Sequence, residues 1–516
     1  MSSTTKKTLL TSGVILVLLI AAHLGIRWTE NKIRHEIDSL SFISFETIDV
    51  NVLRKSVSLS KVEGQKKGFQ GKVDLLQVKG LNLFSIIRND GFFVEEVLVD
   101  GLAIEYRRKD QKSEIDSTQS TREEDLPKIS IENLELKNSI FKLFEDEKLI
   151  FSTKIAAVFS ELTDDEISSP REIPGRLEQM TLDTPKFHTP DGYYEIAAKQ
   201  IALNSDLLRV FDVAITCKKE KYELGNIVGH EIDWFDASVD SITMKISDLG
   251  SLLKQPEIAK IKIHSPTLTV FRDKRLPFPE NRRPPLVRDL LSNNEFSFAL
   301  DTIEFMDGKI TYQQFVKEEK GSGMISFERL NATITDLTSY TFERKKNPRL
   351  LANCALYGEA KLFADITFPG NRNAKQTLVK GKVMSMDLTI FNKMISYVSV
   401  LELKSGQSDN LEFEFSYNDT LSAGDMKFVY EDLAVAFLEK QESEPDGVLN
   451  KVKGFLVNNL VIDKSNNLES NKFRVGKIKF KRDERKSVFN YWWGSILVGF
   501  KSSTGVDTSG EKIDVN

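Results

Sequence analysis

The chain has 516 residues, of which 28% are charged, with a formal net charge of −5 and two cysteines. This balance is typical of an ordinary protein surface and excludes the strongly basic surface of a nucleic-acid-binding protein. The cysteines, Cys217 and Cys354, are too few for a disulfide-rich scaffold or a cysteine-rich zinc module. We expect two isolated buried thiols, because free cysteine packs as a small apolar residue, with pairing in an oxidising compartment as the alternative.

Residues 8–26 form the one apolar run of membrane length in the sequence, without any Asp, Glu, Lys or Arg. A helix of this length spans about 28 Å, close to one hydrocarbon core. We therefore predict a transmembrane anchor. A cleaved signal peptide is the alternative, although the run is long for one and no clean cleavage site follows it. The anchoring side chains are predicted to be Leu9, Leu10, Val14, Ile15, Leu16, Val17, Leu18, Leu19, Ile20, Leu24 and Ile26.

Basic residues on the two sides of this run compete to set its orientation. Lys6 and Lys7 favour a cytoplasmic N-terminus at residues 1–7, whereas Arg27, Lys32 and Arg34 lie just beyond the span. We expect the N-terminus inside and the bulk of the chain outside. Polar, helix-forming sequence over residues 27–40 predicts a short helical stalk.

Residues 41–480 alternate between apolar and polar side chains, as in Phe296 to Phe305 and Leu411 to Phe415. This period of two puts one face of a sheet on an apolar environment and the other on water. The fold class is therefore mostly β. We predict an elongated, twisted, groove-like antiparallel β-sheet after the transmembrane helix, in one continuous body, with an amphipathic helix at the C-terminal end.

Two segments interrupt the alternation. Residues 110–128 are rich in Ser, Thr and Glu and predict a mobile surface loop. Residues 274–285 contain four prolines, which cannot lie in a central strand because proline lacks a ladder donor. A short helix is expected next, over residues 286–291, and residues 501–516 have the composition of a disordered tail.

Residues 481–500 predict a helix with a basic start and an apolar stripe. The stripe has helical spacing. Such a helix can lie in a membrane interface, or it can cap the open end of the sheet, and the sequence leaves both open. The stripe consists of Phe489, Trp492, Trp493, Ile496, Leu497 and Phe500.

The sequence contains little that suggests catalysis. His230-Glu231 begins like a zinc-protease helix, but Trp234 stands where the second histidine is required. No metal or other cofactor is expected, and we predict a protein that is not an enzyme. The alternating apolar residues are instead candidates for a lipid-binding groove, with ordinary β-core packing as the equally weighted alternative. They are Phe296, Phe298, Leu300, Ile303, Phe305, Leu411, Phe413 and Phe415.

Residues 381–438 resemble the C-terminal region of the AsmA-like family of bacterial envelope proteins, the relatives of TamB. The likeness lies in Met386 to Asn392, in Ser405-Gly406, and in Tyr430 to Leu433. Residues 482–500 look like the terminal helix that follows such regions. The resemblance implies an inner-membrane anchor, a single-pass topology, and a body in the periplasm of a Gram-negative bacterium. It also implies a long sheet curled into a groove.

Membrane phospholipid is the partner that the resemblance implies, with envelope proteins as further partners and no nucleic acid. The implied function is to bind or conduct phospholipid along the apolar groove, in transport between the two membranes or in outer-membrane homeostasis. The alternative is a passive envelope scaffold, or an outer-membrane assembly factor, whose sheet is a closed core and whose loops bind protein partners. The sequence leaves open whether the groove is open or filled.

Overall fold

The computed structural model describes residues 27, 30, 31 and 43–506, with internal gaps. Among these residues, no helix has both the length and the apolar content needed to span a membrane. The predicted anchor, most of the stalk, the predicted loop up to residue 127 and Phe296 lie outside the described residues. The gaps are 67–68, 83–84, 86–87, 89–90, 109–127, 169–171, 205, 247–248, 255, 280, 293–296, 318–320, 340–345, 372, 400, 438–461 and 470–472.

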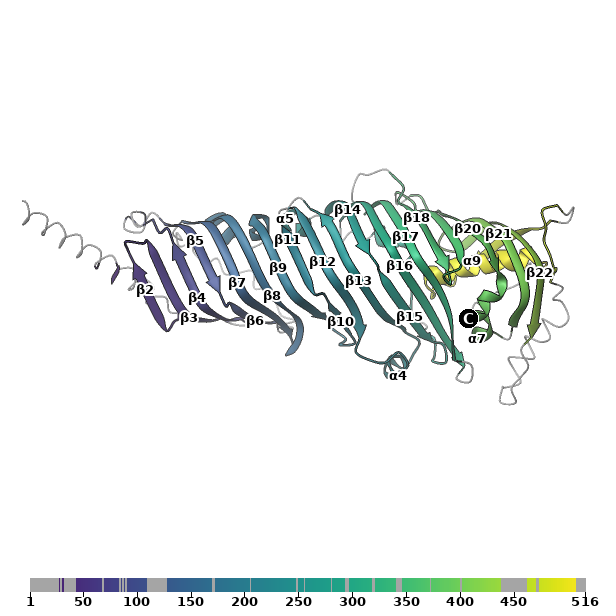
Figure 1. Ribbon diagram of the computed structural model, residues 1–516, viewed down its shortest axis with the longest axis horizontal. Helices are drawn as coiled ribbons and strands as arrows, with labels where there is room; N and C mark the ends of the chain where they lie inside the picture. The colour runs from purple at the N-terminus through teal and green to yellow at the C-terminus, as the bar shows by residue number, and fades with distance from the viewer. Residues whose placement is uncertain are drawn as a thin grey trace, which may run out of the picture. The chain divides into compact units, whose positions relative to one another are not determined.

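The described chain is mostly β, as predicted, and it divides into two compact units. Unit 1 comprises Met1–Pro190, Ala197–Leu208 and Ser247–Leu253, and unit 2 comprises the rest. Within each unit, neighbouring strands lie side by side in a sheet (Figure 1).

Unit 1 contains the first strands of the chain and a few short helices. Its strands are β1 (Ile43–Ser44), β2 (Thr47–Asn51), β3 (Ser56–Lys66), β4 (Phe69–Lys79), β5 (Phe92–Asp100), β6 (Ala103–Arg108), β7 (Ile129–Glu145), β8 (Lys148–Thr163), β9 (Leu177–His188) and β11 (Gln200–Asn204). Its helices are α3 (Asp164–Ser168), η1 (Ile173–Arg176) and most of α5 (Leu249–Lys254).

Unit 2 contains the longer strands and the C-terminal helix. Its strands are most of β10 (Tyr194–Ala197) and β12 (Leu207–Cys217), then β13 (Asp233–Lys245), β14 (Glu257–His264), β15 (Thr267–Asp273), β16 (Ala299–Lys317), β17 (Gly321–Thr338), β18 (Arg349–Leu356), β19 (Ala360–Thr367), β20 (Thr377–Asp387), β21 (Leu401–Tyr417), β22 (Leu421–Phe437) and β23 (Val475–Lys481). Its helices are α4 (Glu223–Val228), α6 (Val287–Leu291), η3 (Leu388–Phe391), α7 (Asn392–Val398) and α9 (Val488–Ser503). The predicted helices over 286–291 and 481–500 are therefore α6 and α9.

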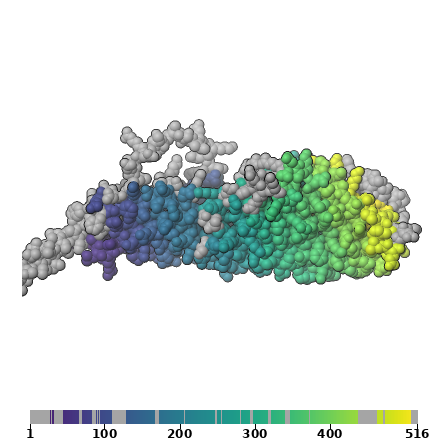
Figure 2. All heavy atoms as spheres, turned by 90° about the horizontal axis from the view of Figure 1, so that it is seen from above, coloured from purple at the N-terminus to yellow at the C-terminus, as the bar shows by residue number. Residues whose placement is uncertain are grey.

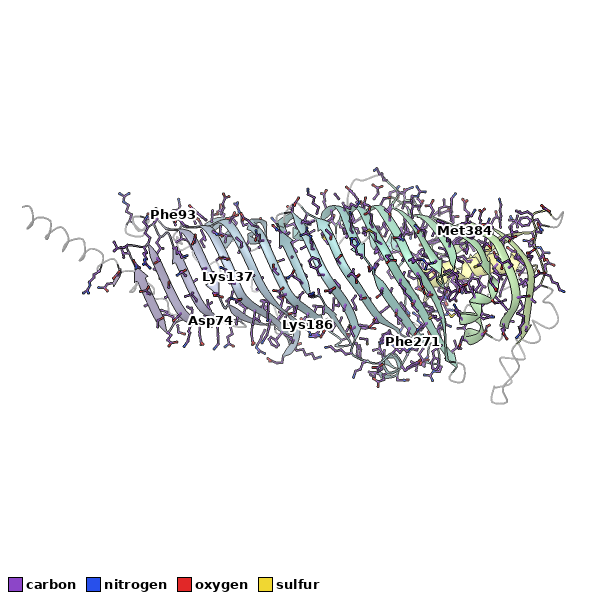
Figure 3. The ribbon with its side chains drawn as sticks, in the orientation of Figure 1. Asp74, Phe93, Lys137, Lys186, Phe271 and Met384 are labelled. Atoms are coloured by element: carbon purple, nitrogen blue, oxygen red, sulfur yellow. The ribbon has the colours of Figure 1, made fainter. Side chains whose placement is uncertain are left out.

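Strand β23 illustrates why these sequences form half-buried strands. Ile478 and Phe480 are buried, and the lysines that alternate with them are exposed. Successive side chains of a strand point to opposite faces, so this alternation gives one apolar face and one charged face. Met384 of β20, labelled in Figure 3, is two residues from Lys382 and therefore lies on the charged face, where it is 41% exposed.

The prediction of an antiparallel sheet is correct for most pairs but wrong at two places. In unit 1, β5 and β6 pair end to end with β4 in antiparallel register, and both pair with β7 in parallel register. In unit 2, β14 and β15 pair with β13 antiparallel and with β16 parallel. A parallel pair requires a crossover connection of a dozen or more residues. The two segments predicted as loops, around 110–128 and 274–285, are parts of these crossovers.

Residues in the left-handed conformation lie side by side where the strands are interrupted. Gly101, between β5 and β6, stands beside Asn138 of β7. In unit 2, Ser265, Asp307 and Arg329 occupy neighbouring places on β14–β15, β16 and β17. An extra residue in a strand bends it and increases its twist. Because these positions are paired across the sheet, neighbouring strands bend at the same point along their length.

The two units differ in how much apolar surface they bury. In unit 2, a large cluster of buried residues joins strands β18 to β23 with α9. In the described part of unit 1, the corresponding cluster of buried residues consists of Val50, Val57, Leu81 and Val94. Most apolar side chains of β7 are only half-buried. Among the described residues, unit 1 therefore buries less of its apolar sheet face than unit 2 does.

The aligned bends give a test of the fold at Asn138. Its φ is 46°, and its side-chain amide donates to Asp100 Oδ1 at 2.8 Å. We expect Asn138→Val to destabilise unit 1 by about 1–2 kcal/mol, because a β-branched residue is strained in the left-handed region. Asn138→Gly is the control, since glycine adopts this φ without strain and loses only one exposed hydrogen bond. Urea unfolding of both variants should separate them, and equal losses would contradict a requirement for positive φ.

Glu166 stabilises the connection between β8 and β9 through hydrogen bonds and an ion pair. Its carboxylate accepts hydrogen bonds from the Thr163 backbone N–H at 3.0 Å and from Arg176 Nε at 2.8 Å, and the Thr163 hydroxyl also donates to it. The side chain of Glu166 is only 11% exposed. The Thr163 hydroxyl, followed by Arg176, lowers the pKa of Glu166 to about 2. The charged form is therefore stabilised in the folded state.

This lowered pKa predicts how the stability of unit 1 depends on pH. The contribution of Glu166 is fully present above the ordinary carboxyl pKa and is lost as pH falls toward about 2. We expect Glu166→Gln to lower the thermal midpoint at pH 7, and the difference from wild type to shrink between about pH 5 and pH 2. Asp165→Asn changes an exposed carboxylate of the same helix and is the control. A difference that persists unchanged at pH 2 would refute this role.

Candidate functional site

Five of the predicted groove residues lie on the same face of the unit 2 sheet: Ile303 and Phe305 of β16, and Leu411, Phe413 and Phe415 of β21. Phe305 pairs with Ala332, and the register row continues through small residues of β18, β19 and β20 to Phe413. Residues paired directly across neighbouring strands share a face. The row consists of Phe305, Ala332, Ala352, Ala364, Gly381 and Phe413, and its face is called the apolar face of unit 2.

Small side chains in the middle of this row let large ones lie across it. The ring of Phe413 lies so close over Gly381 that an added Cβ there would be 2.1 Å from it. Phe413 also stacks with Phe415, with ring centroids 6.1 Å apart. Leu411 and Phe415 are buried in the unit 2 cluster, and Phe413 packs against it. These three candidates therefore belong to a packed region.

The other predicted groove residues lie at the β16 end of the sheet. Ile303 is 8% exposed and pairs with Ile261 and Ile334. Leu300 is half-buried and pairs with Leu337. Phe298 precedes β16, and its backbone N–H donates to Ser339 Oγ at 3.1 Å. Ile303 shares a face with Phe305, whereas Leu300, an odd number of residues away in the same strand, lies on the opposite face.

The opposite face of this sheet is ionic. Lys382 Nζ lies 2.7 Å from Glu412, Lys380 Nζ lies 3.1 Å from Glu414, and both pairs join β20 to β21. The hydrogen bond from Lys382 lowers the pKa of Glu412. A hollow of about 1050 Å³ runs over strands β16 to β22, and the charged side chains of these pairs line it. Phe363, also in its lining, is 45% exposed.

Helix α9 docks on the apolar face through its small residues. Gly494 lies against the Phe480 ring, and Gly499 lies against Ile478 and Met426. Ser495, which is fully buried, hydrogen-bonds to Ser422 of β22 at 2.7 Å. A glycine allows this close approach because it has no Cβ. The helix therefore caps the sheet over β22 and β23.

The predicted apolar stripe of α9 is divided between two environments. Trp492, Ile496 and Phe500 pack against the unit 2 cluster, with the Phe500 ring 4.7 Å from that of Phe428. Phe489 and Trp493 are 70% and 41% exposed, Leu497 is half-buried, and the C-terminal residues form part of the molecular surface in Figure 2. Sequence reasoning missed the docking residues, although Gly494, Ser495, Gly499 and Ser503 recur at helical spacing.

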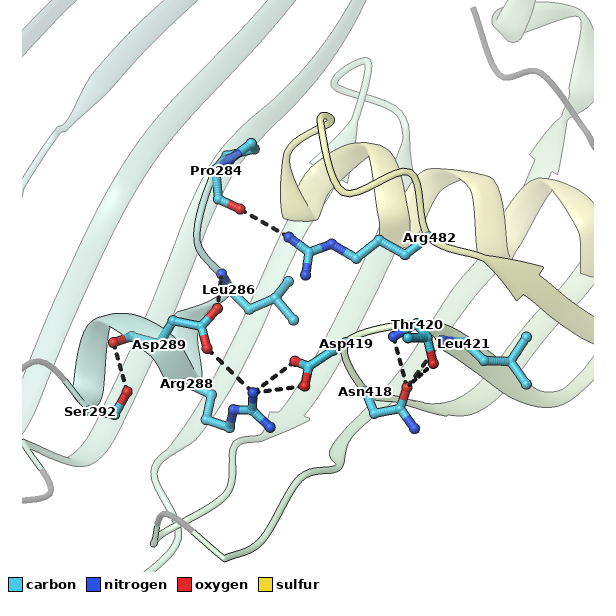
Figure 4. A network of polar contacts seen from close by, with 10 residues as sticks. All are labelled: Pro284, Leu286, Arg288, Asp289, Ser292, Asn418, Asp419, Thr420, Leu421 and Arg482. Carbon is cyan, nitrogen blue, oxygen red and sulfur yellow. Dashed lines mark hydrogen bonds and ion pairs between the residues drawn. The ribbon is translucent and has the colours of Figure 1, made fainter. Parts of the chain in front are cut away.

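The crossover segment, residues 274–298 between β15 and β16, links distant strands of unit 2. At its start, Arg282 Nη2 lies 3.2 Å from Asp233 of β13. Further along, Arg288 Nη2 donates to both carboxylate oxygens of Asp419, at 2.8 and 2.9 Å. Asp419 lies in the turn between β21 and β22. The segment therefore ties β13 to the turn between β21 and β22. Figure 4 shows the second of these contacts, between Arg288 and Asp419.

The contact between Arg282 and Asp233 belongs to a buried ion-pair cluster. Arg272 is 9% exposed, and its Nε donates to Asp233 Oδ1 at 2.6 Å. Burial alone would lower the pKa of Arg272, but the adjacent Asp233 carboxylate raises it, so the guanidinium remains charged. Nearby, Lys274 Nζ is 3.4 Å from Glu231. Breaking one partner of such a buried pair leaves the other charge uncompensated.

A group of buried polar atoms lies near the contact between Arg288 and Asp419. The guanidinium of Arg482 donates from Nη2 to the Pro284 carbonyl at 2.9 Å. Its Nε, the Tyr491 hydroxyl and Trp492 Nε1 are buried, and none of them makes a hydrogen bond to the described residues. The Tyr417 ring lies 5.2 Å from the Tyr491 ring and 6.4 Å from that of Trp492.

In unit 1, an apolar row crosses four neighbouring strands in register. Tyr106 of β6 pairs with Leu143 of β7, Leu143 with Phe151 of β8, and Phe151 with Phe187 of β9. Tyr106 is 43% and Phe187 is 37% exposed, and the two between them are half-buried. This row is called the unit 1 apolar row. Sequence reasoning did not single it out, because its residues come from four separate segments.

The described residues contain no group of three or more His, Cys, Asp or Glu side chains that could hold a metal ion. His230 Nδ1 lies 3.1 Å from the Glu231 carbonyl oxygen. Cys217 and Cys354 are both buried and unpaired, as expected. Burial raises the pKa of the Cys354 thiol to about 11, which keeps it protonated at neutral pH.

Comparison of the chain with protein-family models and with curated proteins gives no match.

The docking of α9 through small residues leads to a prediction. We expect Gly494→Leu to destabilise unit 2 by about 1–3 kcal/mol, because a Cβ at Gly494 would lie 2.5 Å from the Phe480 ring. Phe489→Leu changes a residue that is 70% exposed on the same helix and should alter stability by less than about 0.5 kcal/mol. Urea unfolding followed by tryptophan fluorescence compares them. Comparable losses of stability in both variants would mean that the small residues of α9 do not hold the helix on the sheet.

Proposed function

We propose that this protein binds the acyl chains of phospholipid on the face of unit 1 that carries the unit 1 apolar row, without catalysing a reaction. The observation that carries the proposal is the unit 1 apolar row, four apolar side chains in register on neighbouring strands. Apolar surface exposed to water costs about 25 cal/mol per Å². An acyl chain laid along the row would remove that cost for both surfaces, so the exposed fractions of Tyr106 and Phe187 support a bound lipid.

Two features of the sequence support a setting for this function. The apolar run at residues 8–26 supports a membrane anchor, and the resemblance of residues 381–438 supports the AsmA-like family. We place the body in the periplasm of a Gram-negative bacterium, where it would bind phospholipid in transit between the two membranes. In this proposal, unit 2 does not take up the lipid, since α9 and Leu286 of the crossover segment pack in its apolar cluster.

A passive envelope scaffold is the second candidate. It is favoured by the packed apolar face of unit 2, where Leu411, Phe415 and Met426 are buried beneath the chain's own helix. A sheet filled in this way needs no lipid to cover it. In that case the loops and the ionic face would bind a protein partner.

Lipid analysis of the full-length protein separates the two candidates. We expect the wild type, extracted in mild detergent, to carry phospholipid, and the double variant Tyr106→Asp, Phe187→Asp to lose at least about half of it, because each carboxylate would have to be desolvated against the acyl chain. Both positions are partly exposed, so the variant should fold. Native mass spectrometry and lipid extraction measure the copies per chain.

The matched control is Leu351→Asp, Phe363→Asp. These two residues are each 45% exposed and line the hollow on the ionic face of unit 2. We expect this control to retain the wild-type lipid content. Equal lipid content in all three proteins would rule out the unit 1 apolar row as the binding site, and a lipid-free wild type would favour the scaffold.

A further inference from the structure

The strongest unassigned feature is the group of buried polar atoms around Arg482, at the junction of the crossover segment, the turn between β21 and β22, and the start of α9 (Figure 4). Tyr491 is 2% exposed, yet its hydroxyl makes no hydrogen bond to the described residues. The same holds for Arg482 Nε and for Trp492 Nε1. Nearly all buried polar groups in proteins have a partner, so three such atoms in one region require an explanation.

All three groups can donate, and two can only donate. A guanidinium nitrogen and an indole nitrogen carry no acceptor, and a tyrosine hydroxyl rotates to either role. Burial raises the pKa of Tyr491, so its hydroxyl keeps its proton. The indole of Trp492 approaches the Tyr417 hydroxyl, but no hydrogen bond of normal geometry joins them. The natural complement to such a set is a ligand whose polar atoms only accept.

The charges around the donors permit an anion. Asp419 is the acidic side chain that acts on Tyr491, and both of its oxygens already accept from Arg288 Nη2. Arg482 contributes a further positive charge, of which only Nη2 is used within the described chain, by the Pro284 carbonyl. Arg288 Nη2 also lies 3.4 Å from Asp289, so Arg288 is shared between two aspartates, and Arg482 is the cation that acts on Tyr491. Arginine binds phosphate oxygens well because its planar fork matches them.

The donors also border the apolar face of unit 2. The Tyr491 ring lies 5.2 Å from Tyr417 and 6.1 Å from Phe480, and all three belong to the buried cluster. A ligand with a phosphate at Arg482 would therefore have its remaining part beside aromatic rings. We propose that Arg482, Tyr491 and Trp492 form a binding site for a phosphate group, either of a phospholipid headgroup or of free phosphate. This site lies in unit 2 and does not depend on lipid binding by the unit 1 apolar row.

Thermal unfolding of the full-length, delipidated protein with defined probes tests the proposal. The probes are inorganic phosphate, dihexanoyl phosphatidylglycerol, and dihexanoyl glycerol, which has the acyl chains without the phosphate. We expect at least one phosphate-bearing probe to raise the unfolding midpoint of unit 2 by about 2 °C or more, and dihexanoyl glycerol to leave it unchanged. A shift with both phosphate-bearing probes indicates a general phosphate site, and a shift with the phospholipid alone indicates a headgroup site.

Two variants and a control tie the response to the site. Tyr491→Phe removes only the unpartnered hydroxyl, and Arg482→Gln removes the charge, so each should abolish the shift. Tyr430→Phe removes another buried phenol, whose hydroxyl already donates to the Asp463 carbonyl at 2.9 Å, and should keep the shift. No shift with either phosphate probe would overturn the proposal and leave buried water as the partner of these atoms. A shift that Tyr491→Phe and Arg482→Gln both retain would also overturn it.

The unit 1 experiment can fail without affecting this result. The Tyr106→Asp, Phe187→Asp variant keeps Arg482, Tyr491 and Trp492 intact, so its phosphate response should equal that of the wild type. Loss of the response in that variant would show that the signal comes from unit 1, and it would count against a site at Arg482.

Discussion

A sheet with period-two alternation has one apolar face, and that face must be covered by something. In unit 2 the chain covers it with its own C-terminal helix and with the crossover segment between β15 and β16. In unit 1 the buried cluster is small, and the register row from Tyr106 to Phe187 stays partly exposed. This difference in covering distinguishes the packed apolar face of unit 2 from the partly exposed apolar row of unit 1.

The opposite, ionic face of the unit 2 sheet follows from the same alternation of apolar and polar residues. Lysine and glutamate alternate with the core residues of β20 and β21, and the cross-strand pairs Lys380–Glu414 and Lys382–Glu412 follow from the register alone. Exposed pairs of this kind contribute little stability. Their effect is to keep one face hydrated, so that an apolar ligand has only one face of the sheet on which to bind.

Sequence reasoning predicted the mostly β fold, the short helix at 286–291 and the C-terminal helix because each depends on local periodicity. Phe305 and Phe413, both predicted as groove residues, lie on one face across four intervening strands, while their role as groove residues stays a prediction. Sequence reasoning did not predict the parallel pairs, because nothing in the composition of a loop shows on which side of a strand the next strand will lie. It also missed Arg482, since a buried donor without a partner is a property of packing between segments far apart in the chain.

The ion pair between Arg288 and Asp419 joins residues that are 131 positions apart, and α9 begins only at Val488. Domains of a growing chain fold as units, with N-terminal parts first. Strands β16 to β20 would therefore leave the ribosome well before the turn and the helix that cover them. During synthesis their apolar face would be open to water, to chaperones and to other chains, so the completion of α9 is the event that closes unit 2 against aggregation.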